Sequence, residues 1–385
     1  MEFTVTEKGV VDFAEIVRAE AHGGRILLLT EEGRAGDDVA AAFAGAGLPV
    51  TRRNVTEGTI TDYATLSRSD LPEGIMAAVG AGGAAAIAAT KGIRLARNLP
   101  RLLIPLDLSA LSAVDDRAFF GTKGDLLSLR CEDARVLYDP ALVAKGGRVR
   151  EGVGQLVALW IELFDAAYEA LIEGDVCPSG ALDALVKAGA RLSSIREATA
   201  AQDVAAVLLA WVREGAFRAL PLTGTAHTLA LLAAKTSGGR VTDFLYPAAY
   251  VLAKLYARYL GDLPLEHAAP PDRARNAELL EKRCGVGASP LLTRAKGYAE
   301  GYERRARLTA EYREDFAEVL SDRSLPLAAL SRVYRRTRKG EDESPPPSPT
   351  ALLALLSLTG EAVSGYPLLR HIKTTGLLEP LLVAS

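Results

Sequence analysis

The sequence predicts an α/β N-terminal domain with a Rossmann-like parallel sheet, followed by an all-α helical domain. Over residues 1–147, short apolar runs alternate with Ala- and Gly-rich helical stretches. That alternation is typical of a parallel sheet covered by helices on both faces. Over residues 148–385, apolar residues recur at helical spacing and strand-like runs nearly vanish. The pair Gly146-Gly147 therefore marks the predicted boundary between the two domains.

Strands are expected where short apolar runs lie between turn residues. Five runs in the first domain meet this description: Arg25–Thr30, Leu48–Arg52, Gly74–Val79, Arg101–Pro105 and Ala134–Tyr138. A helix is expected over Asp37–Ala46, between the first two of these strands.

Helices are expected through most of the second domain, because apolar residues there recur at the i, i+3, i+4 and i+7 positions. The predicted ranges are 150–173, 180–216, 225–236, 242–261, 272–284, 291–320 and 350–358. One segment, Lys339–Thr350, is charged and then proline-rich. Because proline cannot donate a backbone hydrogen bond, this segment is interpreted as a solvated connector, with a proline-rich peptide ligand as the alternative.

Composition excludes several classes of protein. The 385 residues include 48 acidic and 45 basic side chains, a balance that argues against nucleic-acid binding. Gly, Pro or charged residues interrupt the longest apolar stretches before the roughly 18 residues that a membrane span requires. The three cysteines are far apart and odd in number, which argues against a disulfide framework. The first residues lack the layout of a signal peptide. We therefore expect a cytoplasmic protein with a small-molecule substrate, without nucleic-acid or membrane partners, and a homodimer as the assembly that symmetry favours.

Two glycine- or acid-rich turns are candidates for ligand binding. Gly80, Gly82 and Gly83 connect a predicted strand to a helix of small residues, an arrangement in which backbone N–H groups can approach a pyrophosphate. The alternative is that these glycines only permit a tight turn. Asp107 and Ser109 follow the strand Arg101–Pro105, so they are expected at the ligand-binding edge of the sheet or on a solvated loop.

The four histidines limit the available chemistry. No two of them have the spacing of a zinc site on one helix. His227 lies at the start of an apolar helix, where it is either a core residue or a functional one. His371, beside Arg370 and Lys373, is expected on a solvated face. Tyr246 belongs to an aromatic-rich segment and is expected in the core or facing a cleft.

Five segments resemble motifs of the superfamily that contains dehydroquinate synthases, sugar-phosphate cyclases and iron-dependent alcohol and glycerol dehydrogenases. Gly80–Lys91 resembles its GGG-x-x-x-D-x-A-K nucleotide loop, and RLLIPLDLSALSAVDDRAFFGTKG resembles its I-P-T-T-L-x-A…D-S…G-G-K-T-G segment. VLYDPALV resembles V-L-x-D-P-x-L-L, REGVGQLVALWIE resembles R-x-G-x-x-E-x-x-K, and GTAHTLAL resembles G-H-x-x-G-H-A. These segments follow one another in the superfamily's order.

The resemblance implies an NAD-binding sheet domain, a helical domain, and a divalent metal held by one acidic residue and two histidines. In this chain the acidic position is Gln155, the first histidine is His227, and the second falls near Tyr246. An amide, one imidazole and a phenol are weak ligands together, so we expect neither zinc nor iron. Whether NAD still binds is left open, because Ala or Ile replaces the aspartate of the nucleotide loop.

Three hypotheses for function follow. The first is a divergent lyase, cyclase or isomerase of the dehydroquinate synthase type, active in biosynthesis without the usual metal. Its candidate catalytic residues are His227 as general acid and base, with Tyr246, Lys123, Gln155 and Asp116 around the substrate. The second is an NAD(P)-dependent metal alcohol dehydrogenase of the same superfamily. The third is a non-catalytic scaffold.

Overall fold

The protein is described here by a computed structural model. It describes residues 2–6, 9–56, 73–93, 98–114, 117–121, 126–130, 134–174, 179–214, 224–237, 239–261, 282, 301–321, 325–337, 349–363, 365–378 and 381.

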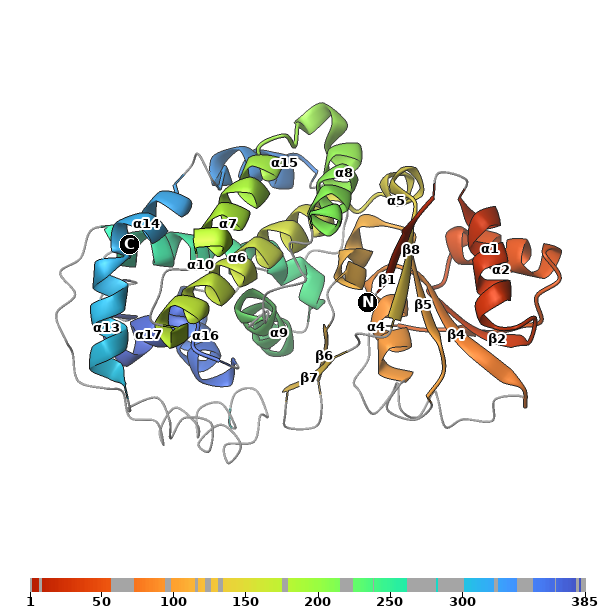
Figure 1. The fold of residues 1–385 in the computed structure, drawn as a ribbon, viewed down its shortest axis with the longest axis horizontal. Coiled ribbons are helices and arrows are strands. Elements are labelled where there is room, and N and C mark those ends of the chain that lie inside the picture. Colours follow the sequence, from red (N-terminus) through yellow and green to blue (C-terminus); the bar gives the residue numbers. More distant parts are fainter. Residues whose placement is uncertain are drawn as a thin grey trace. The chain divides into compact units, whose positions relative to one another are not determined.

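A six-stranded parallel sheet forms the N-terminal part of the fold, as the sequence predicts (Figure 1). Its strand order is β1-β8-β5-β4-β2-β3, and every neighbouring pair is parallel. The strands are β1 (Glu2–Val5), β2 (Arg25–Thr30), β3 (Val50–Asn54), β4 (Ile75–Gly82), β5 (Arg101–Pro105) and β8 (Ala134–Tyr138).

The strand order reverses at β2. The chain runs from β2 to β3 on one side of it, and then returns to β4 on its other side. In open parallel sheets, ligands bind beyond the carboxyl ends of the strands at such a reversal. A ligand site in this part of the chain is therefore expected at the residues that follow β2 and β4.

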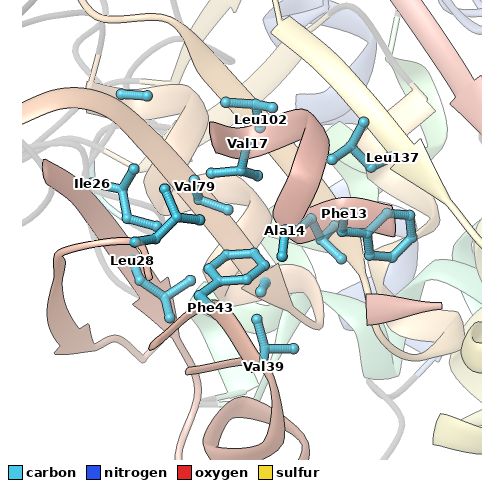
Figure 2. Packing of buried hydrophobic residues seen from close by; sticks show 14 of the residues in the cluster. Phe13, Ala14, Val17, Ile26, Leu28, Val39, Phe43, Val79, Leu102 and Leu137 are labelled. Atoms are coloured by element: carbon cyan, nitrogen blue, oxygen red, sulfur yellow. The ribbon is translucent and has the colours of Figure 1, made fainter. Parts of the chain in front are cut away.

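Helices cover both faces of the sheet because β2 is apolar on both sides. Ile26 and Leu28 pack in one core cluster with Phe13 of α1 (Val10–Glu20) and Phe43 of α2 (Arg34–Gly45) (Figure 2). Leu27 and Leu29, which point to the opposite face, pack in a second cluster with residues of α4 (Ala84–Gly92), among them Ala86 and Ala89. The residues of β2 are apolar on both faces of the strand, and such a continuous apolar run is typical of a parallel strand.

Several strands and helices were not predicted from the sequence. Strand β1 is exposed or half-buried along its length, so it offers no apolar run to recognise. The antiparallel pair β6 (Arg117–Gly121) and β7 (Leu126–Arg130), helix α1 and helix α5 (Pro140–Gly146) were also not expected. Asp139 begins α5, since its Oδ1 accepts the N–H groups of Ala141 and Leu142.

The C-terminal part is helical, which confirms the predicted fold class. Its helices among the described residues are α6 (Val149–Gly174), α7 (Ser179–Leu192), α8 (Ala200–Arg213), α9 (Thr225–Ser237), α10 (Val241–Gly261), α13 (Tyr302–Glu311), α14 (Arg313–Val319), α15 (Leu327–Arg336), α16 (Pro349–Ala362) and α17 (Leu368–Thr374). Two predicted segments lie outside the described residues: the helix over 272–284, apart from Lys282, and residues 339–348 of the connector.

The long helix expected over 180–216 is two helices. Helix α7 ends at Leu192, and α8 begins at Ala200. The break falls at Ser193 and Ser194, whose hydroxyls donate to the carbonyl oxygens of Ala190 and Arg191. Serine hydroxyls compete in this way with the backbone hydrogen bonds of a continuing helix.

The chain divides into two compact units. The first comprises Met1–Thr122, Leu126–Gly152 and Ala198–Val212, and the second includes Val153–Glu197 and Arg213–Ser385. Helix α8 thus belongs with the sheet, and Tyr138 at the end of β8 donates its hydroxyl to the carbonyl oxygen of Ala205 (3.0 Å). In the portion that is described, no helix is both long enough and apolar enough to serve as a membrane span.

Candidate functional site

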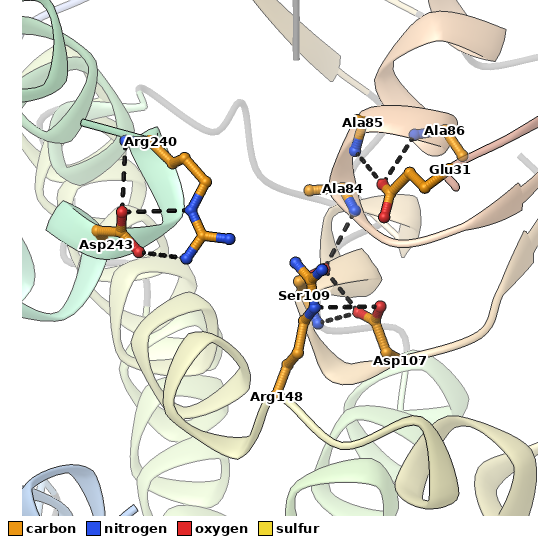
Figure 3. A network of polar contacts seen from close by, with 9 residues as sticks. All are labelled: Glu31, Ala84, Ala85, Ala86, Asp107, Ser109, Arg148, Arg240 and Asp243. Carbon is orange, nitrogen blue, oxygen red and sulfur yellow. Dashed lines mark hydrogen bonds and ion pairs between the residues drawn. The ribbon is translucent and has the colours of Figure 1, made fainter. Parts of the chain in front are cut away.

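The glycine turn after β4 leads into the N-terminus of α4, where backbone N–H groups lack partners within the helix. Side chains of the same unit supply those partners (Figure 3). Oε1 of Glu31 accepts the N–H groups of Ala85 (2.9 Å) and Ala86 (3.3 Å). Oγ of Ser109 accepts the N–H group of Ala84 (3.1 Å). The donors that a phosphate would use are therefore engaged.

Ser109 is held in position by Asp107. Oδ1 of Asp107 accepts both the backbone N–H of Ser109 (2.7 Å) and its hydroxyl (2.6 Å). Burial raises the pKa of Asp107, while the Ser109 hydrogen bonds and Arg148 oppose this rise. Nε of Arg148 lies 3.6 Å from Oδ2 of Asp107. Ser109 thus contacts the helix end directly, and Asp107 holds Ser109 in that position.

The glycines permit close approach by the chain's own atoms. A Cβ on Gly80 would lie 2.2 Å from Oγ1 of Thr90, so this glycine lets β4 pack against α4. A Cβ on Gly83 would lie 2.6 Å from Oγ of Ser109, 2.9 Å from Oδ2 of Asp107 and 3.0 Å from Oε2 of Glu31. The space beside Gly83 is therefore filled by polar side chains, and the dinucleotide implied by the resemblance does not fit this arrangement.

A second polar site lies in the helical unit, between α6 and α9. His227 is in the first turn of α9, as predicted, and its Nδ1 lies 2.6 Å from Oε1 of Glu162 on α6. The same oxygen accepts the backbone N–H of His227 (3.3 Å). The Glu162 side chain is fully buried, whereas that of His227 is 12% exposed. Oε2 of Glu162 has no hydrogen-bond partner among the described residues. The pair has the composition of an oriented acid–base group.

Asp165, one helical turn beyond Glu162, is also completely buried. Tyr256 donates its hydroxyl to both carboxylate oxygens (2.9 and 3.2 Å), and the N–H of Leu368 donates to Oδ1 (3.1 Å). Burial raises the pKa of Asp165 to about 7, and the charge of Glu162 adds to the rise while these hydrogen bonds oppose it. This acid connects α6 to α10 and to the start of α17.

The positions that correspond to metal ligands do not form a good donor set. Gln155 is a buried amide on α6, and it precedes Glu162 by about 10 Å of helix. Tyr246 shares a hydrogen bond of 2.6 Å with Oγ of Ser331 and stacks on Tyr334 at 4.0 Å between ring centroids. Burial raises the pKa of Tyr246 to about 12, which keeps the phenol protonated and a poor ligand. Within the described ranges, no group of three or more His, Cys, Asp or Glu side chains is arranged to hold a metal.

His371 is not on a solvated face, contrary to expectation. His371, Arg370 and Lys373 are all buried in α17. Arg370 donates to the carbonyl oxygens of Gly360, Val363 and Gly365, which explains how its charge is accommodated. The His371 ring lies about 6 Å from the ring centroids of four tyrosines: Tyr168, Tyr259, Tyr302 and Tyr366.

Two of the predicted site residues, Lys123 and Asp116, lie outside the described residues. Conversely, the sequence reasoning missed Glu31, Glu162 and Asp165. A signal for Glu31 was available, because it directly follows β2 at the strand's carboxyl end. For the other two, the indication was their spacing of three within Leu156–Ala167, a stretch of α6 whose remaining residues are apolar, since buried acids require partners.

Comparison with solved structures shows which known proteins share this architecture. No family model and no curated protein matches the sequence. Among solved structures, an iron-containing alcohol dehydrogenase from Thermotoga maritima matches with a TM-score of 0.54 and 14% identity, covering 100% of this chain and 98% of that one. A probable glycerol dehydrogenase from Sinorhizobium meliloti gives the same values. Maleylacetate reductase from Agrobacterium tumefaciens matches with a TM-score of 0.51 and 18% identity, covering 95% and 97%.

The similarity extends over the whole length of each protein. The chain therefore has the fold of the iron-containing alcohol dehydrogenases and their dehydroquinate-synthase-like relatives. The fold resemblance inferred from the sequence is confirmed, and the chemistry has to be argued from the residues that the fold positions here.

Proposed function

We propose that the chain is an enzyme that catalyses redox-neutral proton transfer on a small molecule carrying a carbonyl or hydroxyl group. The reaction class is a lyase, cyclase or isomerase step. The observation that carries this proposal is the 2.6 Å contact between Nδ1 of His227 and Oε1 of a fully buried Glu162. A carboxylate bound to one ring nitrogen fixes the tautomer and directs proton exchange to the other nitrogen.

The proposed step balances without an oxidant. Nε2 of His227 accepts a proton from a carbon adjacent to the substrate carbonyl, and the C–H electron pair moves toward that carbonyl. For an elimination, the same pair forms a C=C bond as a β-hydroxyl group leaves. The imidazolium then returns its proton to the departing oxygen, which leaves as water. Glu162 is the positioning residue, because its negative charge stabilises the imidazolium that forms during the step.

The structural neighbours favour a second candidate, a dehydrogenase or reductase. The proteins of similar fold are an alcohol dehydrogenase, a probable glycerol dehydrogenase and a maleylacetate reductase. In such an enzyme the His227–Glu162 pair would hold and exchange the proton of the substrate hydroxyl group, and a nicotinamide dinucleotide, if bound, would supply the hydride acceptor. This candidate requires dinucleotide binding, which the side chains around Gly83 oppose.

Solvent exchange tests the proposal without knowledge of the natural substrate. The protein is incubated in D₂O with small hydroxyketones, keto acids and ketose phosphates, and deuterium incorporation is followed by proton NMR. We expect the protein to catalyse exchange beside the carbonyl of at least one probe, and His227→Ala to abolish it. Equal exchange in the wild-type protein and His227→Ala would contradict the proposal, as would no exchange with any probe. Formation of NADH from alcohol probes would instead support the dehydrogenase candidate.

A further inference from the structure

We propose that Glu31 replaces an anionic ligand at the N-terminus of α4, so that this chain binds no dinucleotide there. Three backbone N–H donors lie at this helix end, in the sheet unit, and their engagement is independent of the His227–Glu162 pair. Two of them bind Glu31 and the third binds Ser109, all at hydrogen-bond distance.

The charge at this helix end is already compensated. The N-terminus of a helix carries a partial positive charge that attracts an anion. The carboxylate of Glu31 meets that charge from within the chain, and Asp107 contributes a second acidic side chain beside Gly83. Arg148 is an ion-pair partner of Asp107. A pyrophosphate brought to the same donors would meet two acidic side chains, and repulsion between like charges would oppose its binding.

The backbone that carries Glu31 is also fixed in place. Thr30, at the end of β2, is buried, accepts a hydrogen bond from Nε of Arg52 (2.9 Å) and donates to Oδ1 of Asn54 (3.2 Å). A Cβ on Gly36 would lie 3.0 Å from the carbonyl oxygen of Glu31, which shows that α2 packs closely against this turn. The end of β2 therefore holds the Glu31 carboxylate in place. This position is the reversal of strand order, where ligands bind in open parallel sheets.

Removal of the Glu31 charge is expected to create an anion site. The test compares wild-type protein with Glu31→Ala, which empties the position, and with Glu31→Gln, which preserves the shape and a hydrogen-bond acceptor. Glu32→Gln is the matched control, because it removes the same charge from the neighbouring exposed residue. Binding of inorganic pyrophosphate and of NAD⁺ is measured by isothermal titration calorimetry, and the melting temperature is measured with and without pyrophosphate.

The wild-type protein and Glu32→Gln are expected to bind neither probe at millimolar concentration. Both Glu31 variants are expected to bind pyrophosphate at least about tenfold more tightly than the wild-type protein. Pyrophosphate should also raise their melting temperatures selectively, because a ligand that binds only the folded state stabilises it. If Glu31→Ala does not fold, Glu31→Gln supplies the same comparison. NAD⁺ binding by the wild-type protein as tight as that of the variants would overturn the inference, and so would a failure of both folded variants to gain affinity.

Discussion

Oε1 of Glu162 contacts both Nδ1 (2.6 Å) and the backbone N–H (3.3 Å) of His227. One carboxylate oxygen thus fixes the ring and the main chain of the first turn of α9. A carboxylate with no exposed surface costs several kcal/mol unless it is paired and hydrogen-bonded. The position of each residue therefore depends on the other, and the predictions that concern the helical unit begin with this pair.

Replacement of Glu162 by Gln should lower the rate of proton exchange by roughly a hundredfold. The amide has the same shape but no negative charge to orient and stabilise the imidazolium, and general acid–base catalysis is typically worth factors of this size. The rate is measured by deuterium incorporation. Glu173→Gln is the matched control, because it makes the same change on α6 at a half-exposed side chain. Exchange by Glu162→Gln at the control rate would show that the carboxylate plays no part in the reaction.

Asp165 should make stability depend on pH in a direction opposite to that of most acids. Its pKa of about 7 lies above the ordinary value, so the folded state holds this proton more tightly than the unfolded state. The contribution of this carboxyl to the free energy of unfolding therefore falls as pH rises from about 4 to about 7, by at most about 1.4 kcal/mol per pH unit.

Asp165→Asn isolates this effect, because the amide keeps an oxygen that accepts from Tyr256 and Leu368. Urea unfolding at several pH values should show the variant gaining stability relative to the wild-type protein between about pH 5 and about pH 7. A stability difference that stays constant over this interval would mean that Asp165 titrates in its ordinary range.

Gly83→Ala should destabilise the sheet unit by about 1–3 kcal/mol. The added Cβ would approach Oγ of Ser109 to 2.6 Å and two carboxylates to about 3 Å, which would force these side chains away from the helix end. Gly180→Ala is the control. Gly180 lies in α7 with nothing within 4 Å of an added Cβ, so this change should stabilise the protein by up to about 1 kcal/mol. Thermal unfolding measures both, and equal effects would contradict the crowding beside Gly83.

Tyr246→Phe should affect stability more than catalysis. Its hydroxyl shares a buried hydrogen bond with Oγ of Ser331, and removal of one partner leaves the other unsatisfied, at a cost of about 1–3 kcal/mol. A double-mutant cycle with Ser331→Ala measures the coupling by chemical unfolding. Proton exchange should remain close to the wild-type rate. A large loss of exchange with little loss of stability would instead place the Tyr246 hydroxyl at the substrate.

The fold was predictable where burial leaves a periodic pattern in the sequence. The run Arg25–Thr30 is apolar on both faces of the sheet, and this identified it as a parallel strand. Helix α9 was found because apolar residues recur along it at helical spacing. Strand β1 has no such pattern, because it is at most half-buried at the edge of the sheet.

The candidate site was less predictable because its partners come from distant segments. Glu31 contacts residues 54 and 55 positions further along the chain, and Glu162 contacts a residue 65 positions away. His371 was expected on a solvated face because the charged Arg370 and Lys373 lie beside it, yet the carbonyl oxygens of Gly360, Val363 and Gly365 accept hydrogen bonds from Arg370 in the interior. Neither residue type nor spacing reveals which groups converge on a side chain, so the sequence placed His227 at the start of a helix but did not reveal its contact with Glu162.

The protonation state of the His227 ring tests the central claim most directly. Long-range proton–nitrogen NMR correlations distinguish the two ring nitrogens, and the absence of one set of signals in His227→Gln assigns them. The account predicts a proton on Nδ1 in the neutral ring, held by Glu162, and its loss as the dominant tautomer in Glu162→Gln. A neutral ring protonated on Nε2, or a tautomer ratio unchanged by Glu162→Gln, would contradict the acid–base role proposed for this pair.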